Sequence, residues 1–185
     1  NGEDTWNGLA RMDEWLDLDR YLLNGQEYLE LVDGAKKVMG DEAKRAVPGY
    51  DGQGMELVGM FWVHGQADSQ WPSKAAEYEK HLANLIRDLR KDFDSPNLPV
   101  VVAALGQAKR DMREPEKKVF DAQMAVGDPA KHPEFKGNVA SIDTRPMCRP
   151  KEASPGGRDR FIGNAASYLE LGDALASEML QLLND

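Results

Sequence analysis

An apolar segment that runs directly into a polar, glycine-containing loop constrains this fold more than any other feature. Met55 to Val63 is apolar on both faces, which is the pattern of a strand buried inside a sheet. The loop His64 to Asp68 follows, and a helical pattern begins just after Pro72. In open α/β sheets this order places polar groups at the carboxyl end of a strand, where such sheets bind their ligands. We therefore expect any site to lie at this end.

Two further strands repeat the order. Leu98 to Leu105 (LPVVVAAL) predicts a second buried strand, and Asn138 to Asp143 (NVASID) predicts a third, shorter one. Helices are predicted over 26–46, 73–93, 115–126 and from residue 164 onward, with Ser73 and Asn164 as helix caps. This alternation predicts one domain over 1–185, with a parallel sheet that has helices on its faces. The loops 64–72, 106–114 and 144–163 should then open at the same edge of the sheet.

The helical stripes name the residues expected to face the core. They are Tyr28, Leu31, Val32, Ala35 and Met39 in the first helix, Tyr78, Leu82, Leu85, Ile86, Leu89 and Phe93 in the second, and Tyr168, Leu171, Leu175, Met179 and Leu182 in the last. Residues 1–25 show no clean period, and we expect this acidic segment to pack on the body.

Charge and composition exclude several classes of protein. The 185 residues, with 41% hydrophobic and 30% charged content, are typical of one globular domain. The net charge of −9 argues against broad binding to nucleic acid or anionic membranes. No window approaches the ~20 apolar residues of a membrane span. Residues 1–33 hold nine acidic and two basic residues, which form either a solvated face or a metal or partner site.

The one cysteine and the first residue bear on processing. Cys148 has no second cysteine with which to form an internal disulfide, so the redox compartment stays open. No signal peptide is visible, yet the chain begins with Asn1, and we expect that something upstream was removed.

Four segments in order resemble the SGNH-type hydrolases, and among them the sialate O-acetylesterase-like carbohydrate esterases. They are Val58–Asp68, Tyr78–Val101, His132–Val139 and Gly163–Ala174. The first is similar to the family's Trp-x-x-Gly-Glu-Ser/Ala-Asp strand end. The resemblance covers residues 48–185, the C-terminal two-thirds of the family's domain. It implies a three-layer α/β/α sandwich with a parallel, flavodoxin-like sheet, hydrolysis of acetyl esters on sugars by a Ser-His(-Asp) mechanism, and a secreted or periplasmic location. No cofactor is expected.

The chain departs from that family at two catalytic positions. The family's nucleophilic serine lies in a Gly-Gln-Ser-Asn-like turn after the first strand, but residues 1–25 contain no serine. The family's base is a histidine in an Asp-x-x-His arrangement, whereas Gly157 to Asn164 has Arg160 or Ile162 at that place. Arginine stays protonated and cannot accept the serine proton. The first strand of the sheet, which bears the serine, is expected to be missing from this chain.

The resemblance implies that Gly65 and Gln66 form the oxyanion side of a site, where N–H donors stabilise developing negative charge. His64 is the only histidine well placed for acid–base work, and a hydrogen bond to a loop carbonyl is its alternative role. Asp68 is interpreted as a residue that organises the loop or caps the helix. No pair of histidines has metal-ligand spacing, so no metal site is predicted. No phosphate-binding loop is predicted either, because the glycines at 49–54 precede the strand.

The loop 144–163 is basic in an otherwise acidic chain. Its arginines are Arg145, Arg149, Arg158 and Arg160. They either bind a small anionic ligand or pair with the protein's own acidic N-terminal region. Two hypotheses follow. The chain is part of a carbohydrate esterase whose serine is supplied elsewhere, or it is a catalytically silent relative that binds a carbohydrate, another anion or a protein partner through this loop.

Overall fold

Three parallel strands form the centre of the computed structural model, which describes residues 26–106, 111–153 and 164–184. The strands are β1 (Met60–Trp62), β2 (Val100–Ala104) and β3 (Val139–Asp143), in the order β1-β2-β3. Met60 pairs with Val100, which in turn pairs with Val139. The parallel sheet is therefore confirmed, and the loops that follow its strands begin at one edge.

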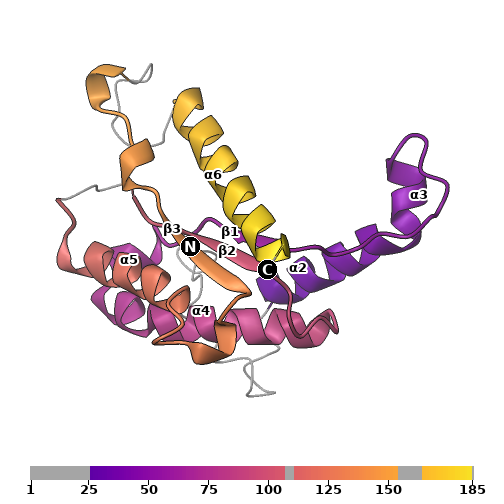
Figure 1. The fold of residues 1–185 in the computed structure, drawn as a ribbon, viewed down its shortest axis with the longest axis horizontal. Coiled ribbons are helices and arrows are strands. Elements are labelled where there is room, and N and C mark those ends of the chain that lie inside the picture. Colours follow the sequence, from indigo (N-terminus) through magenta and orange to yellow (C-terminus); the bar gives the residue numbers. More distant parts are fainter. Residues whose placement is uncertain (1–25, 107–110, 154–163, 185) are drawn as a thin grey trace.

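Helices α4 (Pro72–Asp92) and α5 (Glu114–Val126) cover one face of the sheet (Figure 1). The apolar stripe of α4 is buried as expected, and it packs with Val100 and Val102 of β2 and Val119 of α5. The cap prediction at Ser73 is wrong. Helix α4 begins one residue earlier, at Pro72, and its N-cap residue, Trp71, makes no side-chain capping bond. Proline at the first helical position needs no N–H partner, which explains this start.

Helix α6 (Ala165–Asn184) covers the opposite face, so the three-layer α/β/α sandwich is confirmed (Figure 1). Its buried residues Leu171, Leu175 and Met179 pack against Val101 and Ala103, whose side chains alternate with those that face α4 and α5. Asn164 caps the helix as predicted, because its Oδ1 accepts the N–H of Ser167 at 3.2 Å. Tyr168 was expected in the core but is 55% exposed.

Strand β1 differs from its prediction in length and in burial. It covers three residues rather than nine, and in the described part of the chain it is an edge strand with one neighbour, β2. Met60 and Trp62 pack toward α4 and α5, whereas Phe61 and Val63 are about half exposed, at 49% and 56%. An apolar segment is fully buried only if its sheet extends on both sides and both faces are covered, and here neither condition is met by the described residues.

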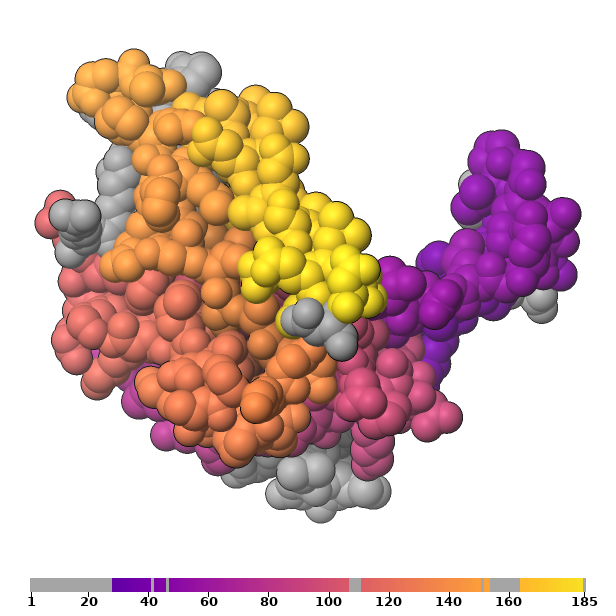
Figure 2. Space-filling model, in the orientation of Figure 1, coloured from indigo at the N-terminus to yellow at the C-terminus, as the bar shows by residue number. Residues whose placement is uncertain are grey.

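The N-terminal helical region is interrupted. Helix α2 (Gln26–Lys37) continues through a wide turn, η2 (Val38–Glu42), into the short α3 (Ala43–Ala46), and the break falls at Gly40. Tyr28 anchors the start of α2, since its hydroxyl donates to Asp92 of α4 at 2.5 Å. Leu31 was expected in the core but is 50% exposed, although Tyr28 and Val32 of the same helix are buried. The far end of this region stands away from the body (Figures 1 and 2).

Short 3-10 turns lie in the connections between these elements. They are η3 (Asp68–Gln70), η4 (Pro133–Phe135), η5 (Arg145–Met147) and η6 (Lys151–Ala153). Arg90 of α4 holds the entries of β2 and β3 together. Its guanidinium donates to the carbonyl oxygen of Leu98 and to the side chain of Asn138 at 2.7–3.2 Å.

Candidate functional site

The loop between β1 and α4 is built around Gly65. Its φ of +130° lies in a region that residues with a Cβ rarely adopt. The loop closes on itself, because Ser69 donates its N–H to the carbonyl of Gly65 at 3.0 Å and its hydroxyl to the carbonyl of Gln66 at 2.8 Å. Gln66 is exposed and Ser69 is buried. The chain thus turns sharply at the carboxyl end of β1 and presents Gln66 to solvent.

His64 and Asp68 form a pair within this loop. The Nδ1 atom of His64 lies 3.7 Å from Oδ2 of Asp68, and their side chains are 28% and 1% exposed. Burial lowers the pKa of His64 below its ordinary value of 6.5, and the Asp68 carboxylate opposes this shift by a smaller amount. The imidazole is therefore neutral at neutral pH, with Nδ1 turned to a carboxylate, an arrangement used for acid–base groups. Asp68 was interpreted as a loop or cap residue, and its closeness to His64 was missed.

Two buried side chains lie beneath the loop and were not singled out from the sequence. Tyr78 of α4 and Gln123 of α5 are fully buried, and both donate to the carbonyl oxygen of His64, at 3.3 Å and 2.5 Å. Burial raises the pKa of the Tyr78 hydroxyl far above its ordinary value, so it stays protonated and can donate. Its ring also stacks on that of His64, with centroids 6.4 Å apart.

The ends of all three strands meet through polar contacts at this edge. Gln123 Oε1 accepts the N–H of Leu105 at 2.6 Å, which joins the loop after β2 to the loop after β1. The hydroxyl of Thr144, just after β3, donates to the carbonyl of Ala104 at 2.5 Å. The buried Cys148 thiol donates to the carbonyl of Gly106 at 2.8 Å. The expectation that the three loops share one edge is confirmed for their described parts.

The arginines of the basic loop are only partly described. Arg145 makes a two-pronged contact with Asp143, at 2.6–2.9 Å, and its guanidinium lies 4.3 Å from the ring centroid of Phe120. Arg149 pairs with Glu170 of α6. Arg158 and Arg160 lie outside the described residues, as does the acidic segment 1–25. The two described arginines therefore pair with acidic residues close to them in the fold.

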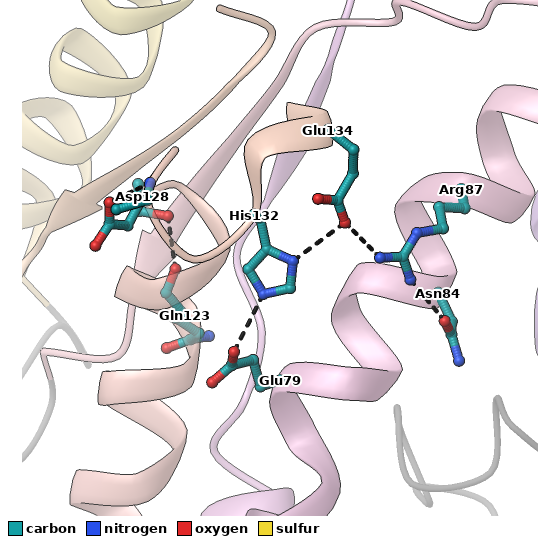
Figure 3. A network of polar contacts seen from close by, with 9 residues as sticks. Glu79, Asn84, Arg87, Gln123, Asp128, His132 and Glu134 are labelled. Carbon is teal, nitrogen blue, oxygen red and sulfur yellow. Dashed lines mark hydrogen bonds and ion pairs between the residues drawn. The ribbon is translucent and has the colours of Figure 1, made fainter. Parts of the chain in front are cut away.

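A second polar cluster surrounds His132, which lies just before η4 (Figure 3). Its Nε2 atom is 3.1 Å from Glu79 of α4, and its Nδ1 atom is 3.3 Å from Glu134, which also pairs with Arg87 at 2.5 Å. These contacts join η4 to α4, and we interpret them as structural. Among the described residues, no group of three or more His, Cys, Asp or Glu side chains is placed to hold a metal ion.

Comparison with known families identifies the chain. The sequence model of the carbohydrate esterase family described as sialic acid-specific acetylesterase matches residues 7–181. The chain belongs to this family. The match extends the family likeness toward the N-terminus, beyond the 48–185 on which the motifs rested. Within the described residues, no helix combines the length and apolar character that crossing a membrane requires.

A solved structure supports the fold. The chain is similar to a protein from Arabidopsis thaliana whose X-ray structure was determined at 1.6 Å, with a TM-score of 0.53 and 22% sequence identity. The likeness covers 74% of this chain and 49% of that one, so the chain spans about half the length of the plant protein. At this identity the similarity concerns the fold alone. No curated protein matches the chain at a significant level.

Proposed function

We propose that this chain carries the oxyanion and acid–base side of a site that hydrolyses acetyl esters on carbohydrates. Membership of the carbohydrate esterase family supports the class of reaction. In the proposal, the backbone N–H of Gly65 and the Gln66 side chain bind the carbonyl oxygen of the acetyl group. The His64 imidazole accepts or returns a proton at its Nε2 atom.

The pairing of His64 with Asp68 is the observation that carries this proposal. The Asp68 carboxylate lies 3.7 Å from Nδ1, beyond hydrogen-bond distance, and its charge favours the tautomer that carries the proton at Nδ1, which leaves Nε2 as the basic atom. Burial keeps the ring neutral at neutral pH, and only a neutral imidazole can accept a proton. Both features occur next to Gly65, at the sheet edge where open α/β sheets bind ligands.

The described residues do not supply the serine that the family's mechanism requires. The first serine in the sequence is Ser69, and it is 2% exposed with its hydroxyl bonded to the Gln66 carbonyl. The only histidines are His64, His81 and His132, so the 157–164 stretch holds no base. We therefore expect this chain alone to bind the acetyl carbonyl without hydrolysing it. Binding through the basic loop has less support, because Arg145 and Arg149 already pair with acidic residues.

Titration with an O-acetylated sialic acid, followed in 1H–15N NMR spectra, tests the proposal. The amide signals of Gly65 and Gln66 should shift most, and the unacetylated sugar should leave them in place. No shift at these residues in a folded protein would overturn the proposal. Acetate release should equal the buffer background. Release that His64→Gln abolishes would instead show that this chain is an enzyme by itself.

A further inference from the structure

Gln123 and Tyr78 act on one atom of the candidate site, the carbonyl oxygen of His64. Gln123 Nε2 donates to it at 2.5 Å and the Tyr78 hydroxyl at 3.3 Å. Both side chains are fully buried, and they come from α5 and α4, the two helices on the same face of the sheet. Two buried donors on a single loop carbonyl restrict the rotation of its peptide group.

The same peptide group contains the N–H of Gly65. The chain has no cis peptide bond among its described residues, and in a planar trans peptide the C=O and the N–H point in opposite directions. When the His64 oxygen is held toward α4 and α5, the Gly65 N–H must point away from both helices. It has no hydrogen-bond acceptor among the described residues, so it is left as a donor for a ligand.

The hydrogen bonds around Gln123 define the orientation of its amide. Oε1 must face the N–H of Leu105, 2.6 Å away, since an NH2 group there would oppose one donor to another. Nε2 is thereby turned to the His64 carbonyl. The Tyr78 oxygen accepts from Gln123 Nε2 at 3.1 Å and from the Trp62 indole at 3.2 Å, so its own hydrogen is free to donate to His64.

Gly65 lets these groups come close. A Cβ at residue 65 would lie 3.0 Å from Gln123 Nε2 and 3.2 Å from the Tyr78 hydroxyl oxygen. Any other residue would push the peptide away from its two donors. Both the positive φ of residue 65 and the close approach of Gln123 and Tyr78 therefore require glycine at this position.

We propose that Gln123, assisted by Tyr78, is a positioning residue that aims the Gly65 N–H at the oxyanion of the substrate. The inference rests on the proposed function, in which Gly65 binds that oxygen. Gln123 touches neither the substrate nor the reacting atoms, and it acts through the plane of one peptide group. Gln123 lies on α5, 58 positions after Gly65 in the sequence, and reaches the loop after β1 through its hydrogen bond to the His64 carbonyl.

The variant Gln123→Met tests this inference, with Thr144→Val as its matched control. Each replaces a buried donor to a main-chain carbonyl at the end of a strand, for His64 in one variant and Ala104 in the other. The orientation of the Gly65 N–H vector is measured by residual dipolar couplings. In Gln123→Met it should rotate relative to β2. Thr144→Val should leave its orientation unchanged.

An unchanged Gly65 coupling in folded Gln123→Met overturns the inference. If that variant does not fold, Tyr78→Phe removes the second donor, together with the acceptor of Trp62 and Gln123, and should rotate the vector by a smaller amount. An unchanged coupling there overturns the part of the inference that assigns an assisting role to Tyr78. These readouts need no ligand. Failure of the proposed function is seen separately, when the acetylated sugar leaves the Gly65 amide signal of the wild-type protein in place.

Discussion

Replacing Gly65 by alanine should destabilise the fold in two separable ways. The first is conformational, because a φ of +130° strains any residue with a Cβ, by about 1–3 kcal/mol. The second is steric, because the new Cβ would lie 2.9 Å from Cγ1 of Val119, well inside the normal contact distance. Overpacking of a buried site typically costs about 1–3 kcal/mol. The sum, about 2–6 kcal/mol, is a large part of the stability of a domain.

Gly137 provides the matched control. It also has a positive φ, +80°, but a Cβ there would meet nothing within 4 Å. Gly137→Ala should therefore lower the free energy of unfolding only by the cost of the strained backbone conformation, about 1–2 kcal/mol.

Urea unfolding at neutral pH, followed by far-ultraviolet circular dichroism, measures both variants against the wild type. The midpoints should fall in the order wild type, Gly137→Ala, Gly65→Ala, with the slope unchanged. Equal losses in the two variants would refute the reasoning, because the close approach of Val119, Gln123 and Tyr78 to Gly65 would then have no energetic effect.

Three further predictions concern charge and burial. The pKa of His64 is lower in the folded than in the unfolded protein, so the wild type loses stability as the pH falls below 6.5. In His64→Gln the free energy of unfolding, measured by urea titration, should fall less steeply below pH 6.5. Arg90→Met leaves buried carbonyl groups without donors and should cost about 2–4 kcal/mol, whereas the half-exposed Arg87→Met should cost under about 1 kcal/mol. A main-chain hydrogen bond and Arg87 lower the pKa of Glu134 to about 2, so the small stability difference between wild type and Glu134→Gln should be present above pH 4.5 and vanish as the pH approaches 2.

The sequence predicts those parts of the fold whose burial can be inferred from their own hydrophobic pattern. The stripe of α4 and the unbroken apolar run of β2 are buried from nearly all sides, so periodicity alone locates them. Strand β1 was predicted to be buried, and this is wrong, because an apolar pattern does not tell whether a further strand and a further helix cover it. The prediction for Tyr168 is also wrong: it is 55% exposed, although Ser167 and Leu171 beside it on α6 are buried.

The residues of the candidate site also divide into those that local sequence predicts and those that depend on distant contacts. The strand-to-loop transition placed His64 and Gly65 correctly at the carboxyl end of β1, since that inference needs only the order of the elements. Gln123 was missed because its contacts are 18 and 59 residues away. A signal did exist: Gln123 interrupts the buried stripe of α5 between Val119 and Val126, and a polar side chain in such a stripe needs a hydrogen-bonding partner.

The open side of β1 has a consequence for work with this chain in solution. In the described part of the fold, its outer main-chain groups have no strand beside them, and Phe61 and Val63 add apolar surface next to them. Strand edges of this kind invite pairing between molecules. The net charge of −9 opposes it by repulsion, which dissolved ions weaken. Low ionic strength and dilute protein are therefore the conditions under which spectra and unfolding curves report on single molecules.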